Sequence, residues 1–170
     1  MIRSIDINAD VGEGIGNDAD IMPYLSSCNI ACGGHAGDKQ SMQETVQLAL
    51  QNGLKIGAHP SFPDPKNFGR FNMEISCADL YTSLKIQIRR FLTILREKHA
   101  TLHHIKPHGA LYNLAAKDEK TASVIIEVVK SIAMPVKLYA PFNSVIGQLA
   151  ISEGLSVTCL LYTSPSPRDS

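Results

Sequence analysis

Hydrophobic positions along this chain follow two periods, which predict two kinds of secondary structure. Short apolar or alternating runs are typical of strands, whereas longer segments with apolar residues every three or four positions are typical of helices. The short runs predict strands at residues 2–8, 27–32, 54–59, 103–106 and 136–140, and a further strand that starts at 155–157. The longer segments predict helices over residues 21–25 and 143–153, and helices that begin after Asp38, Ser76 and Asp118. Strands that alternate with helices indicate βαβ units around a parallel sheet.

Polar residues gather just after at least four of the predicted strands. This distribution is expected for a β/α barrel, in which the active-site loops follow the carboxyl ends of successive strands. A doubly wound sheet would concentrate its site at one switch point instead. The segment 12–16, with sequence GEGIG, lacks the G-x-G-x-x-G spacing and carries a carboxylate that would repel a phosphate. The pattern therefore favours a β/α barrel without a dinucleotide-binding turn.

Three histidines occupy corresponding places after three of the predicted strands. His35 lies in a glycine-rich turn, His59 ends its strand beside a proline, and His108 stands between a proline and a glycine. Any one of them could be a structural residue. In a parallel barrel, however, the carboxyl ends of the strands point at one cavity. We therefore expect at least two of these histidines to share a site.

Polar side chains also mark the end of the first predicted strand. Asp6, Asn8 and Asp10 alternate along the chain, so all three point to one face, and Glu13 follows in the loop. Acidic groups inside a strand are costly to bury unless they are paired or bind a ligand. The alternative is a loop in which Asp and Asn only cap turns. We expect these residues to belong to the site.

Two cations accompany these groups, and the chemistry of the set stays open. Lys106 precedes the Pro-His pair and Arg70 lies in a Phe-Gly-Arg segment, so either could neutralise a carboxylate or a phosphate. Asp10, His59 and His108 are candidate ligands of a divalent metal, because neutral imidazole with a carboxylate suits a hydrolytic ion. The same side chains could instead act as general acids and bases near neutral pH. The spacing does not choose between these roles.

Composition narrows the class of partner. The chain has 170 residues, of which 44% are hydrophobic, and its 16 Lys and Arg residues balance 16 Asp and Glu residues. A balanced charge favours neither nucleic acid nor an anionic membrane surface. There is no apolar run of the length that a signal peptide or a membrane span requires. The four cysteines show no zinc-type pairing. These features predict a cytoplasmic protein that acts on a small molecule.

The C-terminal segment departs from the pattern of the rest. Residues 159–169 read CLLYTSPSPRD, which resembles the translation of a common sequencing adapter in one frame. We therefore expect a β/α-barrel domain over residues 1–158 and a non-native, disordered tail over residues 159–170. On this interpretation the chain is truncated at its C-terminus inside a strand. The alternative is a natural tail rich in Ser and Pro.

Four blocks of the sequence resemble the LamB/YcsF family, whose members are the A subunit of the bacterial ATP-dependent 5-oxoprolinase. They run in the family's order and cover nearly everything before the tail: DINADVGEG at 6–14, residues 27–38, GAHP at 57–60 with FGR at 68–70, and KPHGALYN at 106–113. Departures are few. Gly34 stands where the family usually has Phe, Ser61-Phe62 replaces Gly-Tyr, and Phe71 replaces a common Arg.

This resemblance implies a fold and an activity. The family fold is an irregular (β/α)7-type barrel of the glycoside hydrolase/deacetylase kind, of which this chain would hold about five β/α units. The implied reaction is cleavage of the 5-oxo-L-proline lactam to L-glutamate, driven by ATP hydrolysis, with partner subunits B and C. No Walker motif is present, so ATP follows from the resemblance alone. The truncated chain is expected to be inactive by itself.

The resemblance also suggests roles for the motif residues. Acid/base work falls to five residues: Asp10, Glu13, His35, His59 and His108. Substrate or phosphate binding falls to six: Asp6, Asn8, Asn29, Arg70, Lys106 and Asn113. Two alternatives remain: a metal-dependent amide hydrolase or deacetylase that needs no ATP, and a non-catalytic scaffold subunit whose partners carry the chemistry.

Overall fold

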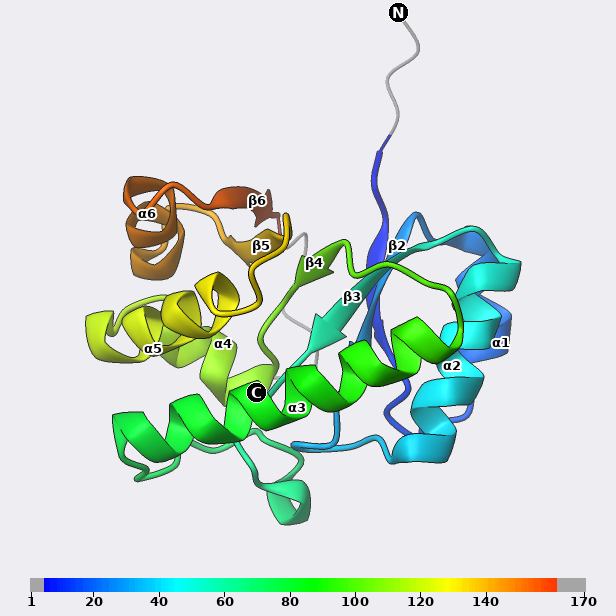
Figure 1. Cartoon of the computed structure of the whole chain (residues 1–170), viewed down its shortest axis with the longest axis horizontal. Coiled ribbons are helices and arrows are strands. Elements are labelled where there is room, and N and C mark those ends of the chain that lie inside the picture. Colours follow the sequence, from blue (N-terminus) through cyan, green and yellow to red (C-terminus); the bar gives the residue numbers. More distant parts are fainter. Residues whose placement is uncertain (1–4, 162–170) are drawn as a thin grey trace, which may run out of the picture.

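Six parallel strands form one sheet that curls into half of a barrel. The computed structural model describes residues 5–161. Its strands are β1 (Asn8–Val11), β2 (Ser27–Ala31), β3 (Lys55–His59), β4 (His104–Ile105), β5 (Lys137–Pro141) and β6 (Ser156–Leu160). They lie in chain order, β1-β2-β3-β4-β5-β6, and each neighbouring pair is parallel. A doubly wound sheet reverses its strand order at the switch point. The sequential order is that of a β/α barrel (Figure 1).

Helices connect the strands and cover the convex side of the sheet (Figure 1). They are α1 (Asp18–Ile21), α2 (Lys39–Gln51), α3 (Cys77–Glu97), α4 (Gly109–Ala115), α5 (Glu119–Lys130) and α6 (Val145–Ser152), with 3-10 turns η1 (Met22–Tyr24) and η2 (Pro65–Asn67). Three helix starts are those predicted. The side chains of Asp38, Ser76 and Asp118 each accept a hydrogen bond from a backbone N–H of the first turn.

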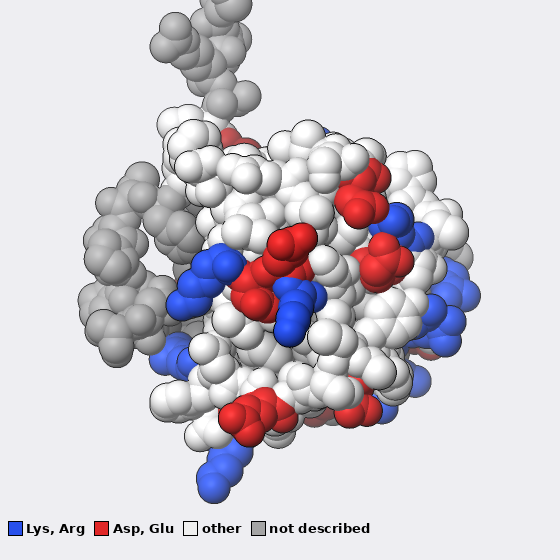
Figure 2. Space-filling view, turned by 90° about the vertical axis from the view of Figure 1, so that its left-hand side faces the viewer, with Lys and Arg blue, Asp and Glu red and all other residues white. Residues whose placement is uncertain are grey.

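The core lies between the sheet and these helices. The predicted apolar stripe of α3 is buried, and it includes Leu84, Ile88, Phe91 and Leu95. This stripe packs beside α5, and α2 packs on β2 and β3. Within residues 5–161, no helix is long and apolar enough to cross a membrane. On the face shown in Figure 2, acidic and basic side chains lie near one another, and neither sign forms an extended patch.

The first strand differs from the prediction. It begins at Asn8 and not at residue 2, and it reaches Val11. Ile5 and Ile7, whose alternation suggested a strand, are 83% and 52% exposed. The pairing with β2 runs from Asn8 opposite Ser27 to Val11 opposite Ile30, so this shifted segment is the one that joins the sheet. Residues 2–4 of the predicted strand lie outside the described residues.

Two other boundaries also moved. The helix expected over residues 21–25 is a single α-helical turn, α1, followed by the 3-10 turn η1. The last strand, β6, includes Cys159 and Leu160, which pair with Ala140 and Pro141 of β5. Sequence analysis had placed those two residues in the non-native tail. Residues 162–170 of that expected tail lie outside the described residues. Helices therefore follow each of the first five strands, and a sixth strand completes the described sheet.

The concave side of the sheet is polar. In parallel strands, residues in register point to the same side, and alternate residues share a face. Asp10 pairs with Asn29, Asn29 with Gly57, and Gly57 with His104, so these positions form one layer inside the half-barrel. His59 lies two positions further along β3, toward the carboxyl end. This polar interior leads directly to the loops that carry the predicted site.

Candidate active site

The three histidines meet at the carboxyl ends of the strands, together with Glu13. Glu13 follows β1, His35 follows β2, His59 ends β3 and His108 follows β4. Each contributes one ligand atom, and these four atoms lie within 4.8 Å of one another. All three histidines are buried. The structure thus brings together residues that the sequence separates by as much as 95 positions, as the barrel interpretation predicted. We call this group the histidine cluster.

Backbone carbonyls determine which ring nitrogens of the cluster carry protons. Nδ1 of His59 lies 2.6 Å from the carbonyl oxygen of Lys106, and Nε2 of His108 lies 2.9 Å from that of Phe68. A carbonyl only accepts, so these two nitrogens donate. Their other nitrogens, Nε2 of His59 and Nδ1 of His108, face each other at 3.0 Å. Both of these nitrogens point into the cluster.

His35 packs tightly inside the cluster. Its Nε2 lies 2.8 Å from a carboxylate oxygen of Glu13. Its ring stacks on that of His108, with centroids 3.6 Å apart and planes 2° from parallel, and meets Phe68 edge-on. Burial lowers the pKa of His35, and the hydrogen bond to Glu13 offsets part of that shift. Burial and the neighbouring His59 and His35 lower the pKa of His108 to about 3. Both rings are therefore neutral at pH 7.

An ion pair lies beside the cluster. Nζ of Lys106 is 2.8 Å and 2.9 Å from the two carboxylate oxygens of Asp10, and one of those oxygens lies 3.3 Å from Nε2 of His59. Burial would raise the pKa of Asp10, but the charges of His59 and Lys106 outweigh it and hold that pKa well below its usual range. About a third of the Asp10 side chain stays exposed. The site therefore contains the ionised carboxylate of Asp10, which is partly exposed, and the ammonium of Lys106, which is nearly buried.

Asn29 links this ion pair to the interior layer. Its amide nitrogen donates to Asn8 at 2.6 Å and to Asp10 at 2.7 Å, and its carbonyl oxygen lies 2.6 Å from Nε2 of His104. Asn29 is completely buried. A buried amide whose polar atoms are all satisfied holds its neighbours in one arrangement. Asn29 therefore orients Asp10, and Asn8 helps to hold Asn29 in place.

His104 joins this network, which sequence analysis did not anticipate. The side chain is fully buried, stacks on Tyr139 with centroids 3.9 Å apart, and donates to Asn29. Burial, with the nearby His103, lowers its pKa to about 3. The period-two spacing from Lys106 was the available signal, because it places His104 on the same inward face.

Three of the predicted site residues lie apart from the cluster. Asp6 accepts a hydrogen bond from Ser27 at 2.8 Å and pairs with the exposed Lys55, toward the amino end of the sheet. Arg70 is exposed, with its guanidinium carbon 5.3 Å from the centre of the Phe68 ring. Asn113 is exposed on α4. Arg70 thus lies next to a ring that contacts the cluster, whereas Asp6 is exposed at the amino end of the sheet.

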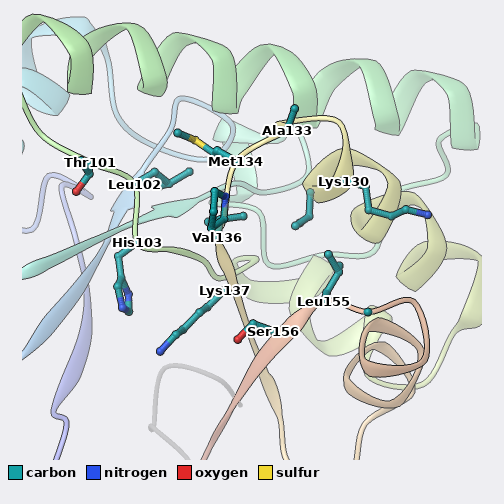
Figure 3. A pocket seen from close by; sticks show the side chains of 13 residues that line it. Thr101, Leu102, His103, Lys130, Ala133, Met134, Val136, Lys137, Leu155 and Ser156 are labelled. Carbon is teal, nitrogen blue, oxygen red and sulfur yellow. The ribbon is translucent and has the colours of Figure 1, made fainter.

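A separate cavity of about 780 Å³ opens elsewhere on the molecule (Figure 3). It is lined by residues that precede β4, β5 and β6, among them Leu102, His103, Val136 and Leu155, and by the end of α5. These positions are at the amino ends of the strands, opposite the histidine cluster. In β/α barrels the amino ends of strands contribute stability and the carboxyl ends carry the active site. The cluster is therefore the candidate active site.

Comparison with known proteins agrees with this geometry. The model of the LamB/YcsF family matches residues 5–166. The chain belongs to the LamB/YcsF family. Among solved structures, it is similar to the lactam utilization protein from Thermus thermophilus, with 38% sequence identity and a TM-score of 0.89. The match covers 92% of this chain and 66% of that protein, so the chain spans less than two thirds of its length. Membership of the LamB/YcsF family and the half-barrel confirm the expected family and the β/α architecture.

Proposed function

We propose that this LamB/YcsF chain is the A subunit of an ATP-dependent 5-oxoprolinase, which opens the lactam of 5-oxo-L-proline to give L-glutamate. The proposal is supported by the family and by the similarity to a lactam utilization protein. The observation that carries it is the Asp10–Lys106 pair beside the imidazole of His59 at the carboxyl ends of the strands. Subunits B and C are the proposed partners.

The chemistry explains why such a site suits the reaction. A five-membered lactam is a stable amide, and its ring nitrogen is a poor leaving group. ATP supplies activation, because a phosphorylated carbonyl oxygen makes the carbonyl carbon open to attack by water. The net reaction then consumes two waters, one that opens the C–N bond and one that releases the phosphoryl group as phosphate, and it requires a proton to be delivered to the departing nitrogen. The site must therefore hold anions and move protons.

The residues present match these tasks. Lys106 is the nearly buried cation of the site, and it would stabilise the substrate carboxylate or a developing negative charge. His59 and His108 have nitrogens directed into the same space, so either would accept a proton from water or donate one to the ring nitrogen. The backbone carbonyls of Lys106 and Phe68 hold those imidazoles in place. The loop over residues 12–16 carries Glu13 into the cluster, so we assign ATP binding to the assembled subunits and not to this loop.

Reconstitution tests the proposal directly. The chain is combined with candidate subunits B and C and given 5-oxoproline and ATP, and glutamate and phosphate are measured. We expect glutamate to form only when ATP and all three subunits are present, with one phosphate released for each glutamate. Glutamate formation that is unaffected by leaving out this chain would contradict the proposal.

The histidine cluster favours a second candidate, a metal-dependent amide hydrolase that needs no ATP. Two or three imidazoles with a carboxylate form the ligand set of many hydrolytic metal sites. The same assay separates the two functions. Lactam or amide hydrolysis by the chain with a divalent metal and without ATP would support the second candidate, whereas strict dependence on ATP would support the first.

A further inference from the structure

We propose that Glu13, His59 and His108 form a binding site for one divalent transition-metal ion, and that His35 is a positioning residue for Glu13. The site follows from the direction of lone pairs and from distances among the described side chains. It can be tested without either of the two reactions; with the ion bound, the inward nitrogens of His59 and His108 serve as its ligands in place of the proton-transfer role proposed above.

The hydrogen bonds of His59 and His108 leave two acceptor nitrogens facing each other. Nδ1 of His59 and Nε2 of His108 donate to carbonyl oxygens, so Nε2 of His59 and Nδ1 of His108 carry lone pairs when the rings are neutral. These two nitrogens lie 3.0 Å apart. Two lone pairs at this distance repel each other unless a cation lies between them. Backbone carbonyls that fix the tautomer in this way are typical partners of metal-binding histidines.

The separations match a common coordination sphere. Metal–ligand distances of about 2.1 Å place two ligand atoms roughly 3.0 Å apart at a right angle and roughly 3.4 Å apart at a tetrahedral angle. The pair from His59 and His108 is 3.0 Å apart, and a Glu13 oxygen lies 3.4 Å from Nδ1 of His108 and 3.8 Å from Nε2 of His59. The rings of His59 and His108 are nearly perpendicular, at 87°, and these two nitrogens are the ring atoms that face each other. Small movements of Glu13 would complete the triad.

His35 belongs to the group but does not suit the same ion. Its ring is parallel to that of His108 and stacked on it, so the in-plane lone pairs of the two rings run side by side and do not converge. Its Nε2 instead lies 2.8 Å from the Glu13 carboxylate, to which it donates. A second group that holds a ligand carboxylate in place typically raises metal affinity. His35 is therefore assigned to orienting Glu13.

The donor set also indicates the kind of ion. Two imidazoles and one carboxylate favour Zn²⁺ or a similar first-row ion, whereas Mg²⁺ and Ca²⁺ prefer oxygen ligands alone. Asp10, a ligand candidate from the sequence, has both carboxylate oxygens on the ammonium of Lys106. Glu13 takes its place in the proposed triad. Three protein ligands leave coordination positions for water or substrate.

Metal binding to the purified chain, treated with chelator and given neither 5-oxoproline nor ATP, tests the site. We expect calorimetry with Zn²⁺ to show one ion per chain, and we expect Co²⁺ to give the visible absorbance of a site with imidazole ligands. Glu13→Gln and His108→Gln should each weaken Zn²⁺ binding at least ~100-fold. His35→Gln should weaken it about 10- to 100-fold with the stoichiometry kept. His99→Gln, at an exposed position just after α3, is the matched control and should bind as the unmodified chain does.

Each outcome decides the proposal. If the two facing nitrogens share a proton and not a metal, Zn²⁺ will not bind at one ion per chain, and the site is refuted. Binding that persists at full affinity in both Glu13→Gln and His108→Gln places the ion elsewhere and refutes it as well. Circular dichroism of each variant separates loss of ligands from loss of fold. The assay contains no substrate, so its failure is distinct from failure of the 5-oxoprolinase proposal.

Discussion

Nζ of Lys106 lies 2.8 Å and 2.9 Å from the two carboxylate oxygens of Asp10, although 96 positions separate these residues in the chain. Lys106 directly follows β4 and Asp10 lies in β1, so the pair spans the concave side of the half-barrel. The Lys106 side chain is 9% exposed and that of Asp10 33%. A buried cation next to a reachable carboxylate is costly unless the fold holds it in place. In this structure Asn29 and His59 contact the same carboxylate and hold it there.

Replacing Lys106 tests its role in the reaction. We expect Lys106→Met to lower the ATP-dependent formation of glutamate by the reconstituted enzyme about 100- to 1000-fold, because the site loses its buried cation. Lys130→Met is the matched control. It removes a lysine that pairs with Glu127 and Glu153 on the surface, and such pairs contribute about 0–1 kcal/mol. Turnover by the control should stay within about twofold of the unmodified protein.

Further substitutions separate catalysis from a scaffold role. The test uses three single variants: Asp10→Ala, His108→Ala and Lys106→Met. If each variant leaves turnover undiminished while the subunits still assemble, the chain is a non-catalytic scaffold. Assembly is checked by size-exclusion chromatography of the complex. Loss of turnover with intact assembly supports a catalytic site on this chain.

Gly57 tests the packing of the interior layer. A Cβ at this position would overlap the imidazole of His104, which donates to Asn29. We expect Gly57→Ala to destabilise the protein by about 1–3 kcal/mol, measured by urea unfolding, because the core must shift or His104 must leave its partner. Gly53→Ala is the control, since nothing lies within 4 Å of its added Cβ. Its φ of 66° costs an alanine about 1–2 kcal/mol, so this control shows backbone strain without a steric overlap. A Gly57→Ala variant as stable as the unmodified protein would show that the His104 contact is unimportant.

The sequence predicted most of the fold because its periodicity and helix caps agree with the tertiary packing. Asp38, Ser76 and Asp118 begin their helices where expected. The first strand was placed wrongly, because two exposed isoleucines, Ile5 and Ile7, mimic the alternation of a half-buried strand. Local pattern does not report which segment pairs with β2. That choice depends on register with a strand that is distant in the sequence.

The composition of the site was predicted less completely than its location. Convergence of His35, His59 and His108 followed from barrel topology alone. The tautomers of His59 and His108 could not be predicted from topology. They depend on the backbone carbonyls of Lys106 and Phe68, which contact the rings only in the folded chain. Period-two spacing suggests that the side chain at position 104 points inward. It does not show that this side chain forms a hydrogen bond with Asn29 of β2. Such contacts are set by the register of three neighbouring strands.

His104 also predicts how stability depends on pH. Its pKa is about 3 in the folded protein and about 6.5 when unfolded. Below pH 6.5, His104 is protonated in the unfolded chain but stays neutral in the folded protein. The free energy of unfolding therefore falls as the pH drops from 6.5 toward 3. The nearby Asp6 partly opposes this shift, whereas His103, His59 and Lys106 add to it.

Urea unfolding at about pH 7.5 and about pH 5.0 measures this contribution. Between these values, His104 should account for about 2 kcal/mol of lost stability. His104→Gln should reduce the pH-dependent difference by that amount, whatever its effect on absolute stability. His99→Gln, at an exposed position, is the control and should keep the difference. An unchanged difference in His104→Gln would mean that this imidazole is protonated in the folded state.

Two departures from the family pattern contact each other behind the histidine cluster. Gly34 stands where the LamB/YcsF family usually has Phe, and Ser61 where it has Gly. An added Cβ at position 34 would overlap Oγ of Ser61 and lie 2.5 Å from Oε1 of Gln87. Gln87 is buried and bonds the backbone N–H and carbonyl of Ser61. We therefore expect the small residue at 34 and the larger one at 61 to compensate for each other.

A double-mutant cycle measures that compensation. We expect Gly34→Ala to destabilise the protein by about 1–3 kcal/mol, because the new methyl group overpacks a filled space. Ser61→Gly removes one of the two clashing groups, so Gly34→Ala should cost less in its presence, with a coupling energy of about 0.5–3 kcal/mol. Urea unfolding of the two single variants and the double variant gives this value. Additive losses would show that Gln87 alone restricts position 34, because that side chain is present in every variant of the cycle.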